Sequence, residues 1–518
     1  MNTKLIVRKE KDSWRPLSGV MVGKDILELL SSSMYVDPMT IYREYIQNAA
    51  DAIDEALDQG LLDRSSHPGL VNISIDVAKR TVLIRDNGIG VRKQNFESQL
   101  GTFGGSLKRG AAGRGFRGVG RLSGLGYCQK LTFRTLAAGD HHVSEMVWDC
   151  RLIKKLLNTT DKHWSLEDLL REVVSIRLLP SEKDAKSFFE VEMNGVIRHK
   201  NDVLLNRETI YHYLSEVAPV PFHPDFSFGS QITEMLGEKV ALGNLNIHVE
   251  GKDEPIYRPY RDSIEVDGEP YDRFTDVKTY TLPSVDDDTS AIAWIMDHGY
   301  KGAVPDKRIA GLRLRCGNIQ IGGNDLLADV FKETRFNSWS VGEIHILDGR
   351  ITPNGRRDYF EQGVHLDNLL NHITPHTREI TARCRESSRL RNRLRDFSRF
   401  EATAIGKLAI IEQGQIGKKV RNACVSETEK LILMMEQCLR LEAFDASIDG
   451  SLTARIRDLD AKLKRMRDFN PSNATLLRSS KSKQAAYEEV FGLIYECSEN
   501  QESARKLVGR IIDRLKRA

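Results

Sequence analysis

The segment Ile41–Leu57, IYREYIQNAADAIDEAL, decides the fold. In a helix, Glu44, Asn48 and Asp51 stand at positions i, i+4 and i+7, so two carboxylates and an amide share one face. The apolar residues that share another face are Ile46, Ala50, Ile53 and Leu57. A carboxylate can polarise a water, and an amide oxygen can complete the coordination shell of Mg²⁺. The pattern predicts an oriented polar site on one face of the helix, and an ordinary amphipathic helix with solvated charges is the alternative.

A glycine-containing turn follows the next strand-like segments, at Ile84–Val91 (IRDNGIGV). Asp86 places one carboxylate beside Gly88 and Gly90, which have no Cβ and so allow a flat ligand to approach the backbone closely. A plain hairpin turn is the alternative interpretation of this motif.

A second glycine-rich stretch spans Gly101–Gly120 (GTFGGSLKRGAAGRGFRGVG). Its basic residues, together with the one that follows it, are Lys108, Arg109, Arg114, Arg117 and Arg121. Such backbone can wrap phosphates with its N–H groups, although a mobile surface loop has a similar composition. Gly113–Gly118 also fits GxGxxG, but the preceding SLKRGAA is no strand, which argues against a dinucleotide fold.

The order of these three motifs resembles the GHKL ATPases, which include gyrase-type topoisomerases, heat-shock protein 90 chaperones, histidine kinases and MutL-type repair proteins. Within this superfamily, the residues of the motifs are most similar to those of heat-shock protein 90. Ser33–Glu44 (SMYVDPMTIYRE) resembles, without a gap, the segment with which that family enters the nucleotide-binding helix, and Gly115–Ser123 (GFRGVGRLS) resembles that family's lid end. The resemblance implies a GHKL (Bergerat) α/β sandwich that binds ATP and Mg²⁺ and hydrolyses ATP.

The resemblance also implies residue roles around adenine and metal. Glu44 is expected to be the general base, Asn48 the magnesium ligand and Asp86 the acceptor for the adenine amino group. Gly88 and Gly90 are expected to shape the adenine pocket.

Further ATP-binding residues are implied by the same resemblance. Backbone N–H groups of the lid end are expected to bind phosphates, and Ser187 stands where the family has a threonine near the adenine. Lys108 or Arg109 is expected to replace a family lysine, because Gly104-Gly105 occupies its place. The remaining residues assigned to ATP binding are Asp51, Gly115, Gly118, Val119 and Gly120.

A fourth motif lies far along the chain, at Ile351–Asp358 (ITPNGRRD). It is similar to the middle-domain loop of the heat-shock protein 90 family, which implies that Asn354 binds the γ-phosphate and that Arg357 is catalytic. A cation from a second domain stabilises the transferring phosphoryl group only in the closed state, which couples hydrolysis to movement. A polar turn with solvated arginines is the alternative.

Three regions are predicted for this α+β chain: residues 1–225, the ATP-binding domain; 226–370, a second α/β domain; and 371–518, an all-helical region. The strands expected in the first are Val71–Val77, Thr81–Arg85, Lys130–Thr135 and Phe188–Met193. LNIHVE, IAWIM, GLRLRCGNIQIG and EIHIL are expected strands of the second. Apolar residues at helical spacing fill the third, and Ser426-x-x-Glu429 predicts a helix start there.

The helical region is also the basic part of the chain. Residues 371–518 hold 29 Lys and Arg against 20 Asp and Glu, a net +9, whereas residues 1–370 carry −6. The helical region is expected to form a homodimer or bind a partner, and the main functional hypothesis is a dimeric clamp that remodels a protein client. The alternative is a MutL- or MORC-like clamp on nucleic acid, favoured by the clustered arginines between 383 and 399.

Composition, motifs and length argue against several other classes of protein. The 518 residues contain no apolar run of membrane-spanning length and no signal peptide at the start, so a cytoplasmic protein without membrane contact is expected. The seven cysteines are scattered and never spaced CxxC, which disfavours disulfides and zinc. A histidine kinase lacks a glutamate at the position of Glu44, and the chain has no room for a topoisomerase cleavage domain.

Overall fold

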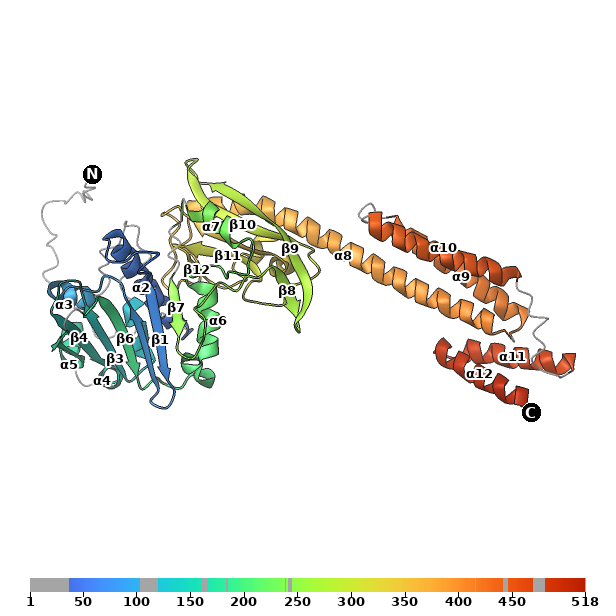
Figure 1. Ribbon diagram of the computed structural model, residues 1–518, viewed down its shortest axis with the longest axis horizontal. Helices are drawn as coiled ribbons and strands as arrows, with labels where there is room; N and C mark the ends of the chain where they lie inside the picture. Colours follow the sequence, from blue (N-terminus) through green and yellow to red (C-terminus); the bar gives the residue numbers. More distant parts are fainter. Residues whose placement is uncertain are drawn as a thin grey trace, which may run out of the picture. The chain divides into compact units, whose positions relative to one another are not determined.

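The computed structural model describes residues 37–102, 120–159, 165–182, 185–237, 239–240, 245–414, 416–440, 446–468 and 480–517. The chain divides into two compact units, Met1–Thr381 and Ala382–Ala518 (Figure 1). The long helix α8 (Val364–Gln413) contains the point of division. The predicted boundaries at residues 225 and 370 stay predictions.

A seven-stranded sheet forms the first part of unit one, with the strand order β5-β4-β3-β6-β2-β1-β7. Its neighbouring strands are antiparallel except β1 and β7, which are parallel. The strands are β1 (Leu70–Asp76), β2 (Thr81–Asp86), β3 (Lys130–Leu136), β4 (His142–Asp149), β5 (Val174–Pro180), β6 (Phe188–Asn194) and β7 (Asn246–Val249). All four strands predicted for the first region are present. The prediction that LNIHVE belongs to the second sheet is wrong, because β7 pairs with β1.

Helices cover this sheet, and α2 (Thr40–Asp58) is the one that matters for the site. Its apolar face packs on β1 and β2, and Ile41, Ile46 and Ile53 are fully buried there. Burying one such side chain contributes about 1.5–3 kcal/mol. The other helical segments of this part are α3 (Lys93–Gly101), η2 (Gly120–Gly126), α4 (Cys150–Leu157), α5 (Leu166–Val173), η3 (Lys200–Leu205), α6 (Arg207–Val217) and α7 (Gly229–Gly237).

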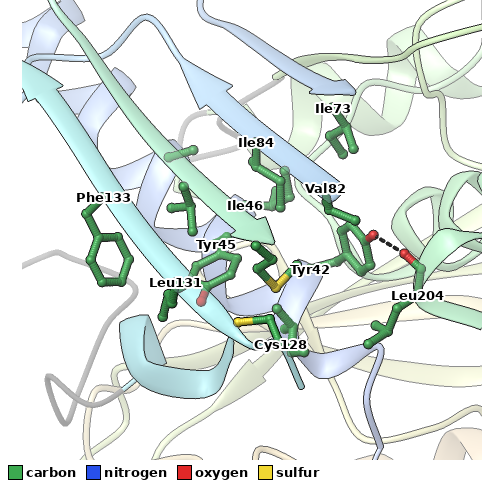
Figure 2. Close-up of a cluster of buried hydrophobic side chains, with 14 of the residues drawn as sticks. Tyr42, Tyr45, Ile46, Ile73, Val82, Ile84, Cys128, Leu131, Phe133 and Leu204 are labelled. Atoms are coloured by element: carbon green, nitrogen blue, oxygen red, sulfur yellow. Dashed lines mark hydrogen bonds between the residues drawn. The ribbon is translucent and has the colours of Figure 1, made fainter. Parts of the chain in front are cut away.

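Two tyrosines fix α2 within the core (Figure 2). The Tyr42 hydroxyl donates to the Leu204 carbonyl at 2.6 Å, which ties the helix to η3. The Tyr45 hydroxyl donates to the Arg121 carbonyl at 3.2 Å and accepts from the Gly124 N–H at 3.1 Å. Buried hydroxyls need such partners, and these two bonds hold η2 against α2.

A second, six-stranded sheet follows, with the order β12-β11-β13-β10-β9-β8. Only β11 and β13 run parallel among its paired neighbours. Its strands are β8 (Ser263–Val266), β9 (Glu269–Pro283), β10 (Thr289–His298), β11 (Gly311–Cys316), β12 (Ile319–Ile321) and β13 (Val341–Ile346), with the short helices η4 (Ala328–Val330) and η5 (Thr334–Trp339) between the last two. The remaining predicted strands lie in this sheet.

A buried charge network anchors the second sheet to the segment that leads into it. Glu343 is fully buried and pairs with Arg258 and with Arg315 Nε at 2.7 Å. Arg258 also donates to the Val220 carbonyl at 3.0 Å. The two guanidinium groups hold the pKa of Glu343 well below its usual range despite the opposing effect of burial.

The second unit is helical, as predicted. It contains the C-terminal part of α8, α9 (Lys418–Leu439), α10 (Ala446–Asp468), α11 (Lys481–Cys497) and α12 (Gln501–Arg517). Leu452, Ile456, Leu459 and Leu463 are buried in its core and follow one another at steps of four, three and four residues. The helix start predicted at Ser426 is wrong, because α9 begins eight residues earlier and Ser426 lies inside it. Among the described helices, none is long and apolar enough to cross a bilayer.

Candidate functional site

The middle of α2 carries three candidate residues. Glu44 and Asp51 are 5% and 8% exposed. Between Thr40 and Asp51, Asn48 is the one exposed residue of the helix. The helix therefore holds Glu44 in a buried setting and leaves the Asn48 amide open to a ligand.

The Glu44 carboxylate lies beside cations from two parts of the chain. Its Oε1 is 3.3 Å from Arg357 Nε and 3.8 Å from Arg43 Nε. Arg357 also donates a hydrogen bond to Gln47, one helical turn from Glu44. Two residues more than 300 positions apart in sequence thus meet at one carboxylate.

Gly120, the first residue of η2, closes the other side of this carboxylate. A Cβ built on Gly120 would overlap Glu44 Oε2. Only glycine allows the backbone to come this near, so η2 and the carboxylate are in direct contact.

The loop that presents Arg357 is shaped by its own hydrogen bonds. Pro353 and Phe360 form a β-bridge, and the Asn354 amide donates to the Asp358 carboxylate at 2.7 Å. Arg357 adopts the left-handed conformation, with φ of 57°, a geometry that costs a non-glycine residue about 1–3 kcal/mol. The Asn354 Oδ1 atom is buried and accepts no hydrogen bond from the described residues, so it remains available to a donor.

Arg43 holds this loop from the side of α2. Its guanidinium donates to the Arg356 carbonyl at 3.1 Å and to the Arg357 carbonyl at 3.4 Å. These bonds fix the backbone of the loop next to Glu44. The sequence motifs did not point to Arg43 or Gln47. Gln47 is three residues after Glu44, so helical periodicity could have placed it on the same helix face as Glu44.

The second part of the site is the end of β2. Asp86 is buried, accepts from the Gly88 N–H at 2.9 Å, and has its pKa raised to about 7, chiefly because burial disfavours the charged form. A Cβ on Gly88 would come within 2.7 Å of the Ala52 carbonyl carbon, and one on Gly90 would overlap the Leu136 carbonyl. Gly90 also has a φ of 69°. Both glycines therefore let this turn pack directly on its neighbours.

Ser187 lies two residues before the β6 residue that pairs with Asp86. It is half-buried and immediately precedes β6, whose Phe189 is paired with Asp86. Lys108, Gly115, Gly118 and Val119 lie outside the described residues.

A magnesium ion fits the chemistry of the α2 face. Mg²⁺ keeps several waters and takes few protein oxygens, and the open Asn48 amide supplies one. In the described part of the chain no group of three His, Cys, Asp or Glu residues is placed to hold a metal by itself. The ion would therefore need ligand phosphates, as it does in nucleotide sites generally.

Residues 38–170, which include α2 and the β2 turn, match the family of histidine kinase-, DNA gyrase B- and HSP90-like ATPases. This segment is therefore a GHKL-type ATPase domain. It is similar to the chaperone protein HtpG of Burkholderia ambifaria and of Burkholderia cenocepacia, 34% identical over 132 residues in each case. HtpG of Citrobacter koseri is 31% identical over 142 residues.

These similarities are confined to the N-terminal part. They cover 22–24% of this chain and 21–23% of the relatives' length. The segment that matches the family includes Glu44, Asn48 and Asp86, whereas Arg357 lies beyond it.

Proposed function

We propose that this protein is a magnesium-dependent ATPase resembling heat-shock protein 90, in which ATP draws a second domain onto the nucleotide. The observation that carries the proposal is the contact at 3.3 Å between Arg357 and Glu44, of which Glu44 belongs to the segment that matches the ATPase family. A guanidinium at this position can stabilise charge on a transferring phosphoryl group.

The chain's own residues suggest an order of events at the γ-phosphate. Arg357 pairs with Glu44, so the carboxylate is engaged by a cation. A bound γ-phosphate would compete for the guanidinium and free Glu44 to accept a proton from the attacking water. The Asn354 Oδ1 atom, left without a donor, would orient that water or accept from a protonated phosphate oxygen.

Adenine recognition is assigned to the β2 turn. The adenine amino group would donate to Asp86, which is held in place by the Gly88 N–H. Magnesium would be held by Asn48 and the phosphates and would supply charge neutralisation to the triphosphate. Asp51, Ser187 and the glycine-rich lid residues complete the proposed ATP site.

The test of the catalytic assignment is Arg357→Ala, compared with Arg356→Ala as the matched control. Arg356 is exposed, and the described contact that it makes with α2 uses its backbone carbonyl. We expect Arg357→Ala to retain ATP binding and to lose more than about tenfold in hydrolysis, while Arg356→Ala stays near wild type. Normal turnover by Arg357→Ala would remove Arg357 from the mechanism.

The wider function is proposed as a cytoplasmic clamp that couples ATP-driven closure to remodelling of a protein client, with a homodimer formed through the helical region. Exposed apolar side chains on two of its helices support self-association: Leu433 and Met434 on α9, and Val490 and Leu493 on α11. A second copy would cover them. Light scattering should give twice the 58.6 kDa chain mass, and Leu433→Glu with Leu493→Glu should give the single mass. A wild-type monomer at micromolar concentration would contradict the dimer.

A further inference from the structure

One stretch of α8, residues 382–399, differs in composition from the rest of its unit. These 18 residues hold seven arginines, no lysine and two acidic residues, a net +5. From residue 400 onward, arginine and lysine are nearly balanced, at 11 and 10, and the net charge is +4 over 119 residues. More than half of the net positive charge of this unit, +5 of +9, is thus concentrated in one short helical stretch whose cationic side chains are all arginines.

Six of the seven arginines fall into two rows along the helix α8 by their spacing in the sequence. Arg385, Arg389 and Arg393 follow one another at intervals of four residues, as do Arg391, Arg395 and Arg399. Each step is about 6 Å along the axis, and the 18 residues extend about 27 Å. All six arginines except the half-buried Arg391 are exposed. We call this surface, residues 382–399 of α8, the arginine face.

Two arginines of the arginine face donate to neutral acceptors, and a third is paired with a carboxylate at the surface. Arg393 donates to the Gln437 carbonyl at 3.3 Å, and Arg395 donates to the Asn392 amide oxygen at 3.1 Å. Both acceptors are neutral, so these bonds do not neutralise the charge of either arginine. Arg399 pairs with Asp396 at 3.2 Å, but this pair is solvent-exposed and so is worth under about 1 kcal/mol. A polyanion can therefore compete for these groups.

We propose that the arginine face binds the phosphate backbone of duplex nucleic acid without sequence preference. Arginine suits this role because its planar fork pairs with phosphate oxygens through two hydrogen bonds. The inference stands apart from the proposed ATPase, since it uses none of the residues assigned to ATP.

Two other polyanions fit the arginine face less well. A membrane-surface helix needs large apolar side chains beside its charges, and the large exposed apolar residues described on α8, Val364 and Ile405, both lie outside 382–399. Binding of single strands relies on exposed aromatic rings for stacking, whereas Phe397 is 1% exposed and Phe400 carries Arg399 over its ring. Backbone contact with a duplex requires neither feature.

The salt dependence of binding measures how many phosphates are contacted. If Arg389, Arg393, Arg395 and Arg399 each neutralise one phosphate, the slope of log K against log salt includes about −3.6 from these contacts. Affinity should then fall about 100-fold between 50 and 200 mM salt. Replacing all four by alanine should remove most of this slope and keep the helix, because alanine is the strongest helix former.

The experiment measures anisotropy of a labelled 30-base-pair DNA duplex of arbitrary sequence with the full chain. The matched control removes four exposed basic residues of α10 instead: Arg457, Lys462, Lys464 and Arg465. We expect salt-dependent binding by wild type and by the α10 variant, and at least about tenfold weaker binding at 50 mM salt by the α8 variant.

Several outcomes would overturn the proposal. They are no duplex binding at 50 mM salt, equal losses in the α8 and α10 variants, or tighter binding to the single strand. Anionic vesicles that bind as tightly as the duplex would indicate a membrane surface as the partner. Polyglutamate that competes as well as the duplex at equal charge concentration would indicate that any polyanion is bound. Circular dichroism of both variants checks that the helices are intact.

Discussion

Adenine recognition should depend on pH through Asp86, because the pKa of this buried carboxyl is raised to about 7. Lowering the pH from 8 to 6 takes the ionised fraction from about nine tenths to about one tenth. If the adenine amino group donates to the ionised form, the apparent affinity for adenosine should fall about tenfold, which is about 1.4 kcal/mol. Adenosine is the probe because, unlike ATP, it has no phosphate that titrates in this window.

The same carboxyl should act on stability with the opposite sign. Its pKa is higher in the folded chain than the ordinary value of 3.8, so the folded state holds the proton more tightly. Its contribution to stability is therefore present at low pH and is lost as the pH rises from about 4 to about 7, by on the order of 4 kcal/mol. Low pH should thus weaken adenosine binding, although the protonated Asp86 carboxyl stabilises the folded state at the same pH.

Calorimetric titration of adenosine at pH 6, 7 and 8 measures the effect, with Asp86→Asn as the control. The variant keeps an oxygen for the Gly88 N–H but has no titrating group, so any remaining affinity should not change with pH. Equal wild-type affinity at pH 6 and pH 8 would refute the assignment of Asp86 to adenine.

Two further predictions concern packing around the site and the second sheet. Gly120→Ala should lower ATP hydrolysis more than about tenfold, since a methyl group there displaces the Glu44 carboxylate, while thermal unfolding shows that the fold remains. Hydrolysis at the wild-type rate would contradict the described contact. Glu343→Gln should cost about 3–5 kcal/mol in urea unfolding, because it leaves buried arginines without their counter-ion, whereas the exposed Glu269→Gln should cost little. Equal unfolding midpoints for the two variants would show that the buried network contributes nothing.

Local pattern predicts the parts of the site that belong to single elements. The helix predicted over Ile41–Leu57 is present as α2. Its apolar residues recur at helical spacing, which is a local signal for a helix that packs one face on the core. The turn after β2 was also predictable, since strand alternation and two glycines are local signals.

Local pattern does not predict pairings between distant segments. Nothing in the apolar alternation of LNIHVE distinguishes a strand beside β1 from one in the second sheet, because each sheet contains a strand that is only partly buried, β7 in the first and β9 in the second. The hydrogen bonds from Arg43 to the loop at Arg357 cannot be predicted from local pattern either, since their acceptors are two carbonyl groups more than 300 residues away. At Ser426, a sequence typical of a helix start lies inside α9, where packing on the bundle core outweighs a local cap.

The central claim is that Glu44 activates water for ATP hydrolysis. Its most direct test is steady-state ATP turnover by the wild-type chain and by Glu44→Ala, with nucleotide binding measured on both. We expect the wild type to hydrolyse ATP and Glu44→Ala to bind ATP yet lose at least about 100-fold in turnover. A wild-type chain that neither binds nor hydrolyses ATP, or a Glu44→Ala variant that turns ATP over at the wild-type rate, would contradict it.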